Sequence, residues 1–195
     1  LVLKIMHRPD LRVEQKVRAM LAAAPELQVE RDGDGGDLVQ LAWPRELLFD
    51  AANNFCGFSM PLLNKPRPVP LNAWFDSRAR ERNQLPQDDR LRVFLALNLA
   101  AMTEYVNRAG HSVVDFKPQN VLAYRQHGYI CLVDCDGFLI RAGNDVFPAA
   151  LATPGYLAPE FHHNFNPHLL DEKQDRFALA VVIYNLLYNG FHPAS

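Results

Sequence analysis

A short loop with three polar groups constrains the fold of this chain more than any other segment. The loop contains Asp115, Lys117 and Asn120, and it follows a stretch from about residue 87 to 110 in which apolar residues recur at helical spacing. Two short apolar runs typical of a hairpin come next, and the second ends at Asp134. The pattern therefore predicts an aspartate, a lysine and an asparagine between a long helix and a hairpin, with a second aspartate behind them.

These four groups are the set that phosphoryl transfer requires. One carboxylate must orient or deprotonate the attacking hydroxyl, and a cation must neutralise charge on the moving phosphate. A carboxylate and an amide must hold magnesium against the phosphate oxygens, because magnesium prefers oxygen ligands. Asp115, Lys117, Asn120 and Asp134 supply these groups.

In this segment the chain resembles the eukaryotic-type protein kinase family. Residues 114–122, Val-Asp-Phe-Lys-Pro-Gln-Asn-Val-Leu, are similar to the kinase catalytic loop, and Asp134-Cys-Asp136 stands where the family has Asp-Phe-Gly. Residues 153–160, Thr-Pro-Gly-Tyr-Leu-Ala-Pro-Glu, resemble the end of the activation segment. Asp175-Arg-Phe-Ala-Leu-Ala resembles the start of the central large-lobe helix, whose Asp braces the catalytic loop. The motifs follow the family's order and cover most of the chain.

The resemblance implies an α+β, two-lobed protein-kinase-like fold that is truncated at both ends. Residues 1–63 would form a partial N-lobe, residues 64–70 with their three prolines the linker, and residues 71–195 a partial C-lobe. A glycine-rich hairpin would precede Lys4, and further helices would follow residue 195. We therefore expect this fragment by itself to be poorly active.

The resemblance also implies roles in the reaction. Asp115 would be the catalytic aspartate, and Lys117 would touch the transferred phosphate. Asn120 and Asp134 would hold magnesium. Asp136, which stands at the place of the family's glycine, would either add a metal ligand or cap the following turn. Asp134 ranks first as the ligand because it follows the apolar strand directly.

The nucleotide site is implied in the same way. Lys4, at the end of a short apolar strand, would reach the α and β phosphates of ATP; alone, it could equally be a solvated lysine. Glu14 would be its helix partner. Only ten positions separate the two, so either the connecting loop is short or the partner is a different residue. The backbone at Met60, Pro61 and Leu62 would contact the adenine.

The leading functional hypothesis is Mg²⁺- and ATP-dependent phosphorylation of Ser or Thr in a protein substrate. Val113-Val114 stands where the family commonly has His-Arg, and that Arg normally binds an activation-segment phosphate. Residues 135–152 contain no Ser, Thr or Tyr, so we expect activity without phosphorylation in that loop. Thr153 is expected to lie beside the catalytic aspartate as a structural hydroxyl.

Two other functions stay open. A pseudokinase that binds nucleotide or acts as a scaffold is compatible with the altered Val113-Val114 and Asp134-Cys-Asp136 motifs. A small-molecule kinase of the aminoglycoside-phosphotransferase type shares the Asp…Asn loop, but residues 153–160 argue against it. The Asp-Cys-Asp-Gly-Phe form and the Gly57-Phe-Ser-Met-Pro61 hinge resemble a bacterial subgroup often found with phosphatase partners, so a cognate phosphatase is an expected partner.

Composition excludes several other classes. The formal net charge of −2 gives no basic field for nucleic acid, and the longest apolar run, Phe177 to Tyr184, is far shorter than the roughly 18 residues that span a bilayer. Three cysteines do not make a disulfide framework or a zinc site, so we expect reduced thiols in a cytoplasmic protein. The Asp/Gly-rich residues 31–37 predict a hairpin turn rather than a calcium loop, because the later Glu and the flanking helices are missing.

Overall fold

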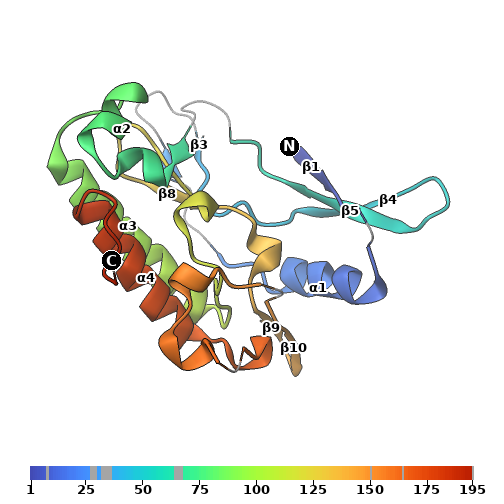
Figure 1. Ribbon diagram of the computed structural model, residues 1–195. Coiled ribbons are helices and arrows are strands. Elements are labelled where there is room, and N and C mark those ends of the chain that lie inside the picture. The colour runs from blue at the N-terminus through green and yellow to red at the C-terminus, as the bar shows by residue number, and fades with distance from the viewer. Residues whose placement is uncertain are drawn as a thin grey trace.

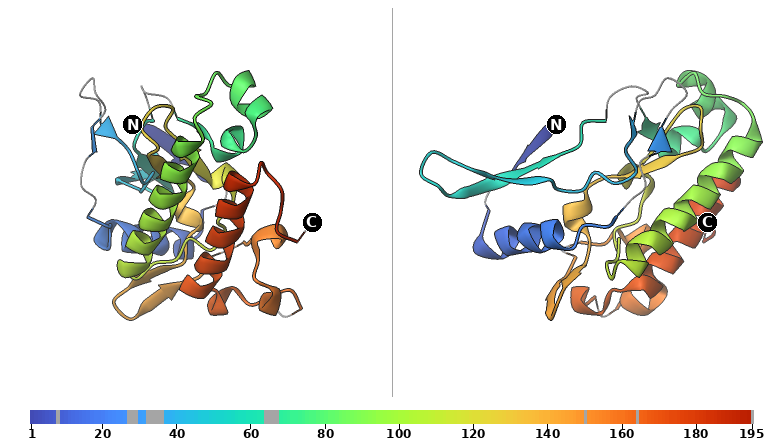
Figure 2. Two further views of the ribbon diagram at one scale, coloured as in Figure 1. Left: turned by 90° about the vertical axis from the view of Figure 1, so that its left-hand side faces the viewer. Right: turned by 180° about the vertical axis from the view of Figure 1, so that it is seen from behind.

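The computed structural model describes residues 1–7, 9–26, 30–31, 37–63, 68–149, 151–163 and 165–194. Within these ranges the chain forms four small antiparallel sheets and four α-helices, which confirms the α+β class. One three-stranded sheet lies at one end of the molecule, and two long helices lie side by side at the other (Figure 1). Seen from behind, the β4–β5 hairpin projects from one side while α3 and α4 run along the other (Figure 2). This arrangement is compatible with a kinase-like fold.

Three strands form the sheet from which Lys4 extends. The central strand β5 (Phe55–Met60) pairs antiparallel with β1 (Val2–Ile5) on one side and with β4 (Glu46–Phe49) on the other. Gly57 on β5 lets β1 approach closely, since a Cβ there would lie 2.1 Å from the carbonyl oxygen of Lys4. The structure confirms the predicted strand at Lys4 as β1, and β5 contains residues 57–60 of the predicted hinge.

Helix α1 (Leu11–Ala22) packs against this sheet. Its N-cap is Asp10, whose carboxylate accepts a hydrogen bond from the backbone nitrogen of Val13 at 2.8 Å. Val17 is buried against the aromatic residues of β5, and Met20 reaches the main core. The apolar face of the helix therefore fixes how its polar flanks are turned toward the rest of the molecule.

A second three-stranded antiparallel sheet carries the polar loop. Its strands are β6 (Val69–Pro70), β7 (Val121–Ala123) and β8 (Ile130–Leu132), with β7 in the middle. A 3₁₀ turn at Pro118–Asn120 leads into β7, and another at Cys135–Gly137 follows β8. The predicted hairpin is thus present. The loop that contains Asp115 and Asn120 precedes β7, and Asp134 follows β8, so these polar residues lie at the same end of the antiparallel hairpin.

The remaining helices are α2 (Ser77–Arg82), α3 (Asp89–Arg108) and α4 (Glu172–Leu187). The long helix α3 confirms the prediction from apolar spacing. Helix α4 begins three residues before the predicted Asp175, because Asp171 acts as its N-cap and accepts a hydrogen bond from the following turn. Apolar faces of α3 and α4 meet in the largest buried core, whose fully buried members include Leu95, Leu99, Val106, Val182 and Leu186.

Two short hairpins complete the described elements. β2 (Glu30–Arg31) pairs antiparallel with β3 (Asp37–Leu38), as a hairpin requires, while residues 32–36 of the turn predicted for residues 31–37 lie outside the described residues. β9 (Ile140–Ala142) and β10 (Asp145–Phe147) form another hairpin, and β9 packs beside α1.

Residues 64–67 of the predicted proline-rich linker also lie outside the described residues, so the lobe boundaries stay a prediction. Among the residues that are described, no helix combines the length and the apolarity needed to cross a membrane.

Candidate active site

A buried aspartate of α4 holds the polar loop in place. The carboxylate of Asp175 accepts hydrogen bonds from the backbone nitrogens of Val113 at 2.8 Å and Val114 at 2.7 Å, and from Asn107 Nδ2 at 2.7 Å. Burial raises the pKa of Asp175 to about 6, and the three donated hydrogen bonds oppose that rise. The side chain is fully buried, so these contacts are shielded from water. The role that the resemblance implies for Asp175 matches this geometry.

The loop has an unusual backbone at the residue that Asp175 holds. Val114 adopts a φ of 62°, in the left-handed region that β-branched residues rarely enter. Such a conformation costs about 1–2 kcal/mol and persists only where surrounding contacts impose it. The hydrogen bond to Asp175 is one such contact, and it sets the direction in which the next residue, Asp115, leaves the loop.

Asp115 is the centre of a hydrogen-bonded network. Its Oδ1 accepts hydrogen bonds from the backbone nitrogen of Thr153 at 2.9 Å and from the Thr153 hydroxyl at 2.6 Å. Its Oδ2 pairs with Lys117 Nζ at 2.5 Å, and the same ammonium donates to Thr153 Oγ1 at 3.1 Å. Thr153 therefore lies beside Asp115 as expected, and the network fixes the carboxylate from three sides.

Asn120 joins this network through its amide nitrogen. Nδ2 donates to the backbone oxygen of Asp115 at 3.0 Å and to its Oδ2 at 3.3 Å. Because the nitrogen is used in this way, the oxygen is the acceptor that the amide has left for a ligand. Asn120 lines a cavity. Five residues were singled out from the loop and the strand behind it, and four of them, Asp115, Asn120, Asp134 and Asp136, line that cavity. The fifth, Lys117, is not among the lining residues and is connected to the cavity through its ion pair with Asp115.

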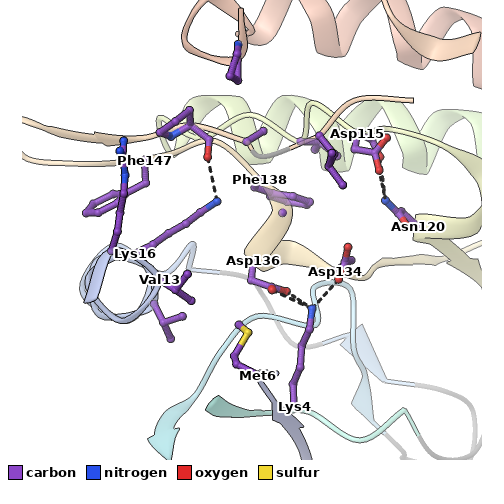
Figure 3. A pocket seen from close by; sticks show the side chains of 18 of the residues that line it. Lys4, Met6, Val13, Lys16, Asp115, Asn120, Asp134, Asp136, Phe138 and Phe147 are labelled. Atoms are coloured by element: carbon purple, nitrogen blue, oxygen red, sulfur yellow. Dashed lines mark hydrogen bonds and ion pairs between the residues drawn. The ribbon is translucent and has the colours of Figure 1, made fainter. Parts of the chain in front are cut away.

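Lys4 reaches across from β1 to the two aspartates after β8 (Figure 3). Its Nζ lies 2.7 Å from Asp134 Oδ1, 2.6 Å from Asp136 Oδ1 and 2.9 Å from Asp136 Oδ2. Burial favours the neutral amine, but the hydrogen bonds to the two carboxylates outweigh it and raise the pKa of Lys4. Asp136 thus does more than cap a turn: its carboxylate, 17% exposed, shares the ammonium with the more exposed Asp134.

The structure corrects the expected partner of Lys4. Glu14 forms an ion pair with Arg18 one helical turn further on, at 2.7 Å, and the carboxylates that Lys4 contacts are those of Asp134 and Asp136. The physical reason is the rotation of α1. Glu14 lies on the flank of the helix that faces away from the cavity, while a residue on the opposite flank, Lys16, lines it.

Two cavities meet at the Lys4 cluster. The first, of about 510 Å³, is lined by the polar residues described above together with residues of α1 and of the segment after β10. The second, of about 730 Å³, is lined by Met60, Pro61 and Leu62, whose backbone the resemblance places at the adenine. Lys4, Asp134 and Asp136 line both cavities. Both volumes are within the usual range of small-molecule sites.

Sequence reasoning missed several residues of these cavities. Leu122 on β7 and Val133 after β8 line the second cavity from one side, and Val2 and Ala42 line it as well. Alternation along β7 is the signal that could have placed Leu122 on the same side as Asn120. Lys16 is the other omission, and its signal is its position on a flank of the apolar face of α1.

The donor set of the cluster suits a hard cation bound together with phosphate. Asp134, Asp136 and the oxygen of Asn120 offer carboxylate and amide oxygens around one cavity. Within the described part of the chain there is no group of three or more His, Cys, Asp or Glu side chains arranged to hold a metal by themselves. Magnesium is typically held by one or two carboxylates plus substrate phosphates, so these residues fit Mg²⁺ that arrives with a nucleotide.

The cysteines agree with their predicted state. All three are free thiols, and Cys131 and Cys135 are buried. Burial raises the pKa of both buried thiols, so they are poor nucleophiles and poor metal ligands.

Comparison with known proteins agrees with the kinase-like geometry of the site. No model of a known protein family matches the chain. Protein kinase YegI of Escherichia coli (strain K12) is 28% identical over 199 aligned residues, which cover all of this chain and 29% of that protein. Leucine-rich repeat serine/threonine-protein kinase 1 of Mus musculus is 28% identical over 128 residues, or 64% of this chain and 6% of that protein.

The chain thus spans less than a third of the length of the curated relatives it matches. Both kinds of relative carry the name of a protein kinase, one from a bacterium and one from a mammal. The order of the motifs, the α+β fold and these similarities together support a resemblance to a protein-kinase-like family.

Proposed function

We propose that the chain carries the catalytic site of a kinase that transfers the γ-phosphate of ATP to a Ser or Thr hydroxyl of a protein, with Mg²⁺. The observation that best supports this proposal is the network around Asp115, in which Lys117, Thr153 and Asn120 fix one carboxylate at the edge of a cavity. Kinase-named relatives support the coarser assignment of kinase activity.

Asp115 would act on the attacking hydroxyl. Thr153 donates to Oδ1, and Lys117 and Asn120 donate to Oδ2, so these contacts would hold the carboxylate in position to accept the hydroxyl proton. The hydroxyl oxygen forms a bond to the γ-phosphorus as the bond to the β,γ-bridging oxygen breaks, and ADP leaves. The ammonium of Lys117 would neutralise charge on the phosphoryl group during transfer.

The nucleotide would extend across both cavities. Its adenine would occupy the second cavity, between the hinge residues Met60, Pro61 and Leu62 and the apolar side chains of Leu122 and Val133. Its phosphates would pass Lys4 and enter the first cavity toward Asp115. Bound Mg²⁺ would neutralise phosphate charge, and the residues suited to hold it are the carboxylates and the amide named above.

Activity without phosphorylation of the activation segment is part of the proposal. Val113 and Val114 are buried and offer a phosphate no charge, and their backbone amides already bind Asp175. Mass spectrometry of the active protein should find no activating phosphate between residues 135 and 152. Such a phosphate, or one on Thr153, would contradict this part of the proposal.

A pseudokinase is the second candidate, and one observation favours it. The ammonium of Lys4 is shared by Asp134 and Asp136, so a nucleotide has to compete with two carboxylates for it. A protein that binds nucleotide without transferring phosphate would show this competition as well. A cognate phosphatase partner and a cytoplasmic location remain predictions from the sequence.

A transfer assay separates the two candidates. The protein is incubated with γ-labelled ATP, Mg²⁺ and a generic protein acceptor, and the label on Ser and Thr is measured. Asp115→Asn should lower the rate on the order of 10²–10⁴-fold while ATP binding persists. Asp145→Asn, a matched change of an exposed aspartate in the β9–β10 hairpin, should leave the rate unchanged.

Loss of less than tenfold in Asp115→Asn would rule out its catalytic role. Binding of ATP by the unchanged protein with no label transferred at any Mg²⁺ concentration would support the pseudokinase instead.

A further inference from the structure

Lys16 is a second lysine in the first cavity. It extends from α1, on the flank next to Val13, while Lys4 extends from β1, so the two ammonium groups enter from different elements (Figure 3). The Nζ of Lys16 donates to the backbone oxygen of Pro148 at 3.4 Å, a long hydrogen bond. Lys16 thus links the helix to the segment after β10 and places its charge inside the cavity.

The ammonium of Lys16 is poorly compensated where it lies. Among the contacts of the described residues, the carbonyl of Pro148 is its hydrogen-bond acceptor, and the nearby carboxylates of Asp134 and Asp136 are bound by Lys4. Burial therefore lowers the pKa of Lys16 to about 8, although the two aspartates oppose the shift. A partly buried cation with one weak acceptor is stabilised by any anion that enters its cavity.

The position of Lys16 specifies which anion fits. The first cavity also contains Asp115, and the second cavity contains the hinge residues, with Lys4 at their junction. A nucleotide with its base at the hinge would therefore have its first phosphate near Lys4 and its terminal phosphates deeper in the first cavity, where Lys16 lies.

We propose that Lys16 is a second phosphate-binding lysine, which contacts the β- or γ-phosphate of the nucleotide from α1. The proposal rests on the proposed nucleotide site. In this arrangement the acidic partners of Lys4 are Asp134 and Asp136, which follow β8, and not a residue of α1. Helix α1 instead contributes the ammonium of Lys16 to the phosphates.

Nucleotide binding to the complete protein tests the proposal. The dissociation constants of Mg·ATP and of AMP are measured by calorimetry for the unchanged protein and for Lys16→Met, which keeps the length of the side chain and removes its charge. Lys16→Met should weaken Mg·ATP roughly 10- to 100-fold, the usual effect of losing one charged hydrogen bond, and should leave AMP unchanged. Lys16→Arg should retain most of the ATP affinity.

Two further variants serve as controls. Lys4→Met should weaken both nucleotides, because its ammonium lies where the first phosphate would pass. Lys173→Met, an equivalent change at an exposed lysine of α4, should alter neither.

The outcomes distinguish a failure of the proposed role of Lys16 from a failure of the proposed function. If the unchanged protein binds ATP and Lys16→Met binds it equally well, the role of Lys16 is refuted and the proposed function stands. If Lys16→Met weakens AMP as much as ATP, its role is structural and the proposal is refuted. If the unchanged protein binds neither nucleotide, the proposed function fails, and the role of Lys16 fails with it.

Discussion

Gly57→Ala should displace Lys4 without altering any polar side chain of the site. Gly57 lies on β5 opposite β1, and a Cβ built on it would lie 2.1 Å from the carbonyl oxygen of Lys4. That atom belongs to the backbone, so a change of side-chain rotamer cannot remove the clash. Ordinary contact begins at 3.4 Å, which means that β1 would have to move by about 1.3 Å.

The cost follows from the hydrogen bonds between the two strands. A shift of this size lengthens an N–H···O bond of about 2.9 Å beyond the range in which it is effective. β1 and β5 share four residue pairs, from Val2 to Ile5. Loss of two or three of their hydrogen bonds, at about 1 kcal/mol each, lowers the free energy of unfolding by about 2–3 kcal/mol. The ammonium of Lys4 would also leave its position between Asp134 and Asp136.

Chemical denaturation and ATP binding measure the two effects. We expect Gly57→Ala to show a lower denaturation midpoint and weaker ATP binding. Gly155→Ala is the matched control, because a Cβ at Gly155 would meet no heavy atom within 4 Å, and its unfolding should match that of the unchanged protein. If Gly57→Ala unfolds within about 0.5 kcal/mol of the unchanged protein, the close approach of β1 to β5 is not as described, and the reasoning about Lys4 fails with it.

Two other predictions concern buried charges. Asp175→Ala leaves the backbone amides of Val113 and Val114 without their acceptor, so the free energy of unfolding should fall by about 2 kcal/mol or more in chemical denaturation; an unchanged midpoint would show that the loop does not depend on α4. Burial lowers the pKa of Lys16 to about 8 from 10.5. Between these pH values the folded protein therefore binds fewer protons at Lys16 than the unfolded chain does. The contribution of Lys16 to the free energy of unfolding should thus rise with pH from about 8 to 10.5. Stability of the unchanged protein minus that of Lys16→Met, measured across this range without nucleotide, should show that slope; a flat difference would contradict the burial of the ammonium.

Local chemistry made much of the site predictable. Asp10 is a good N-cap followed by a helical apolar pattern, and the structure starts α1 at the next residue. The loop from Asp115 to Asn120 is short and lies between the long helix α3 and the β7–β8 hairpin, both of which have clear apolar patterns. Its polar side chains are therefore close together in space. The cavity that contains Asp115, Asn120, Asp134 and Asp136 follows from that proximity.

The rotation of α1 could not be predicted in the same way. Glu14 and Lys16 lie on opposite flanks of Val17, and both flanks border the same apolar face. Which flank faces the cavity depends on how Val17 and Met20 pack against the sheet and the main core, and those contacts join residues distant in sequence. β4 escaped prediction for a related reason, since Glu46–Phe49 shows no clear alternation and is a strand because β5 pairs with it.

The distribution of charge around Lys4 has a consequence for the order of binding. In the structure one ammonium serves two carboxylates, Asp134 and Asp136. Under the proposed function, a phosphate that takes this ammonium leaves both carboxylates facing further negative charge, which in a partly buried cavity is costly. A divalent cation at those carboxylates removes that cost, and the phosphate in turn lowers the cost of releasing Lys4. Nucleotide and cation should therefore strengthen each other's binding by the same factor, as linkage requires. Lys16, whose acceptor is a carbonyl rather than a carboxylate, makes no such exchange and can attract the terminal phosphates first.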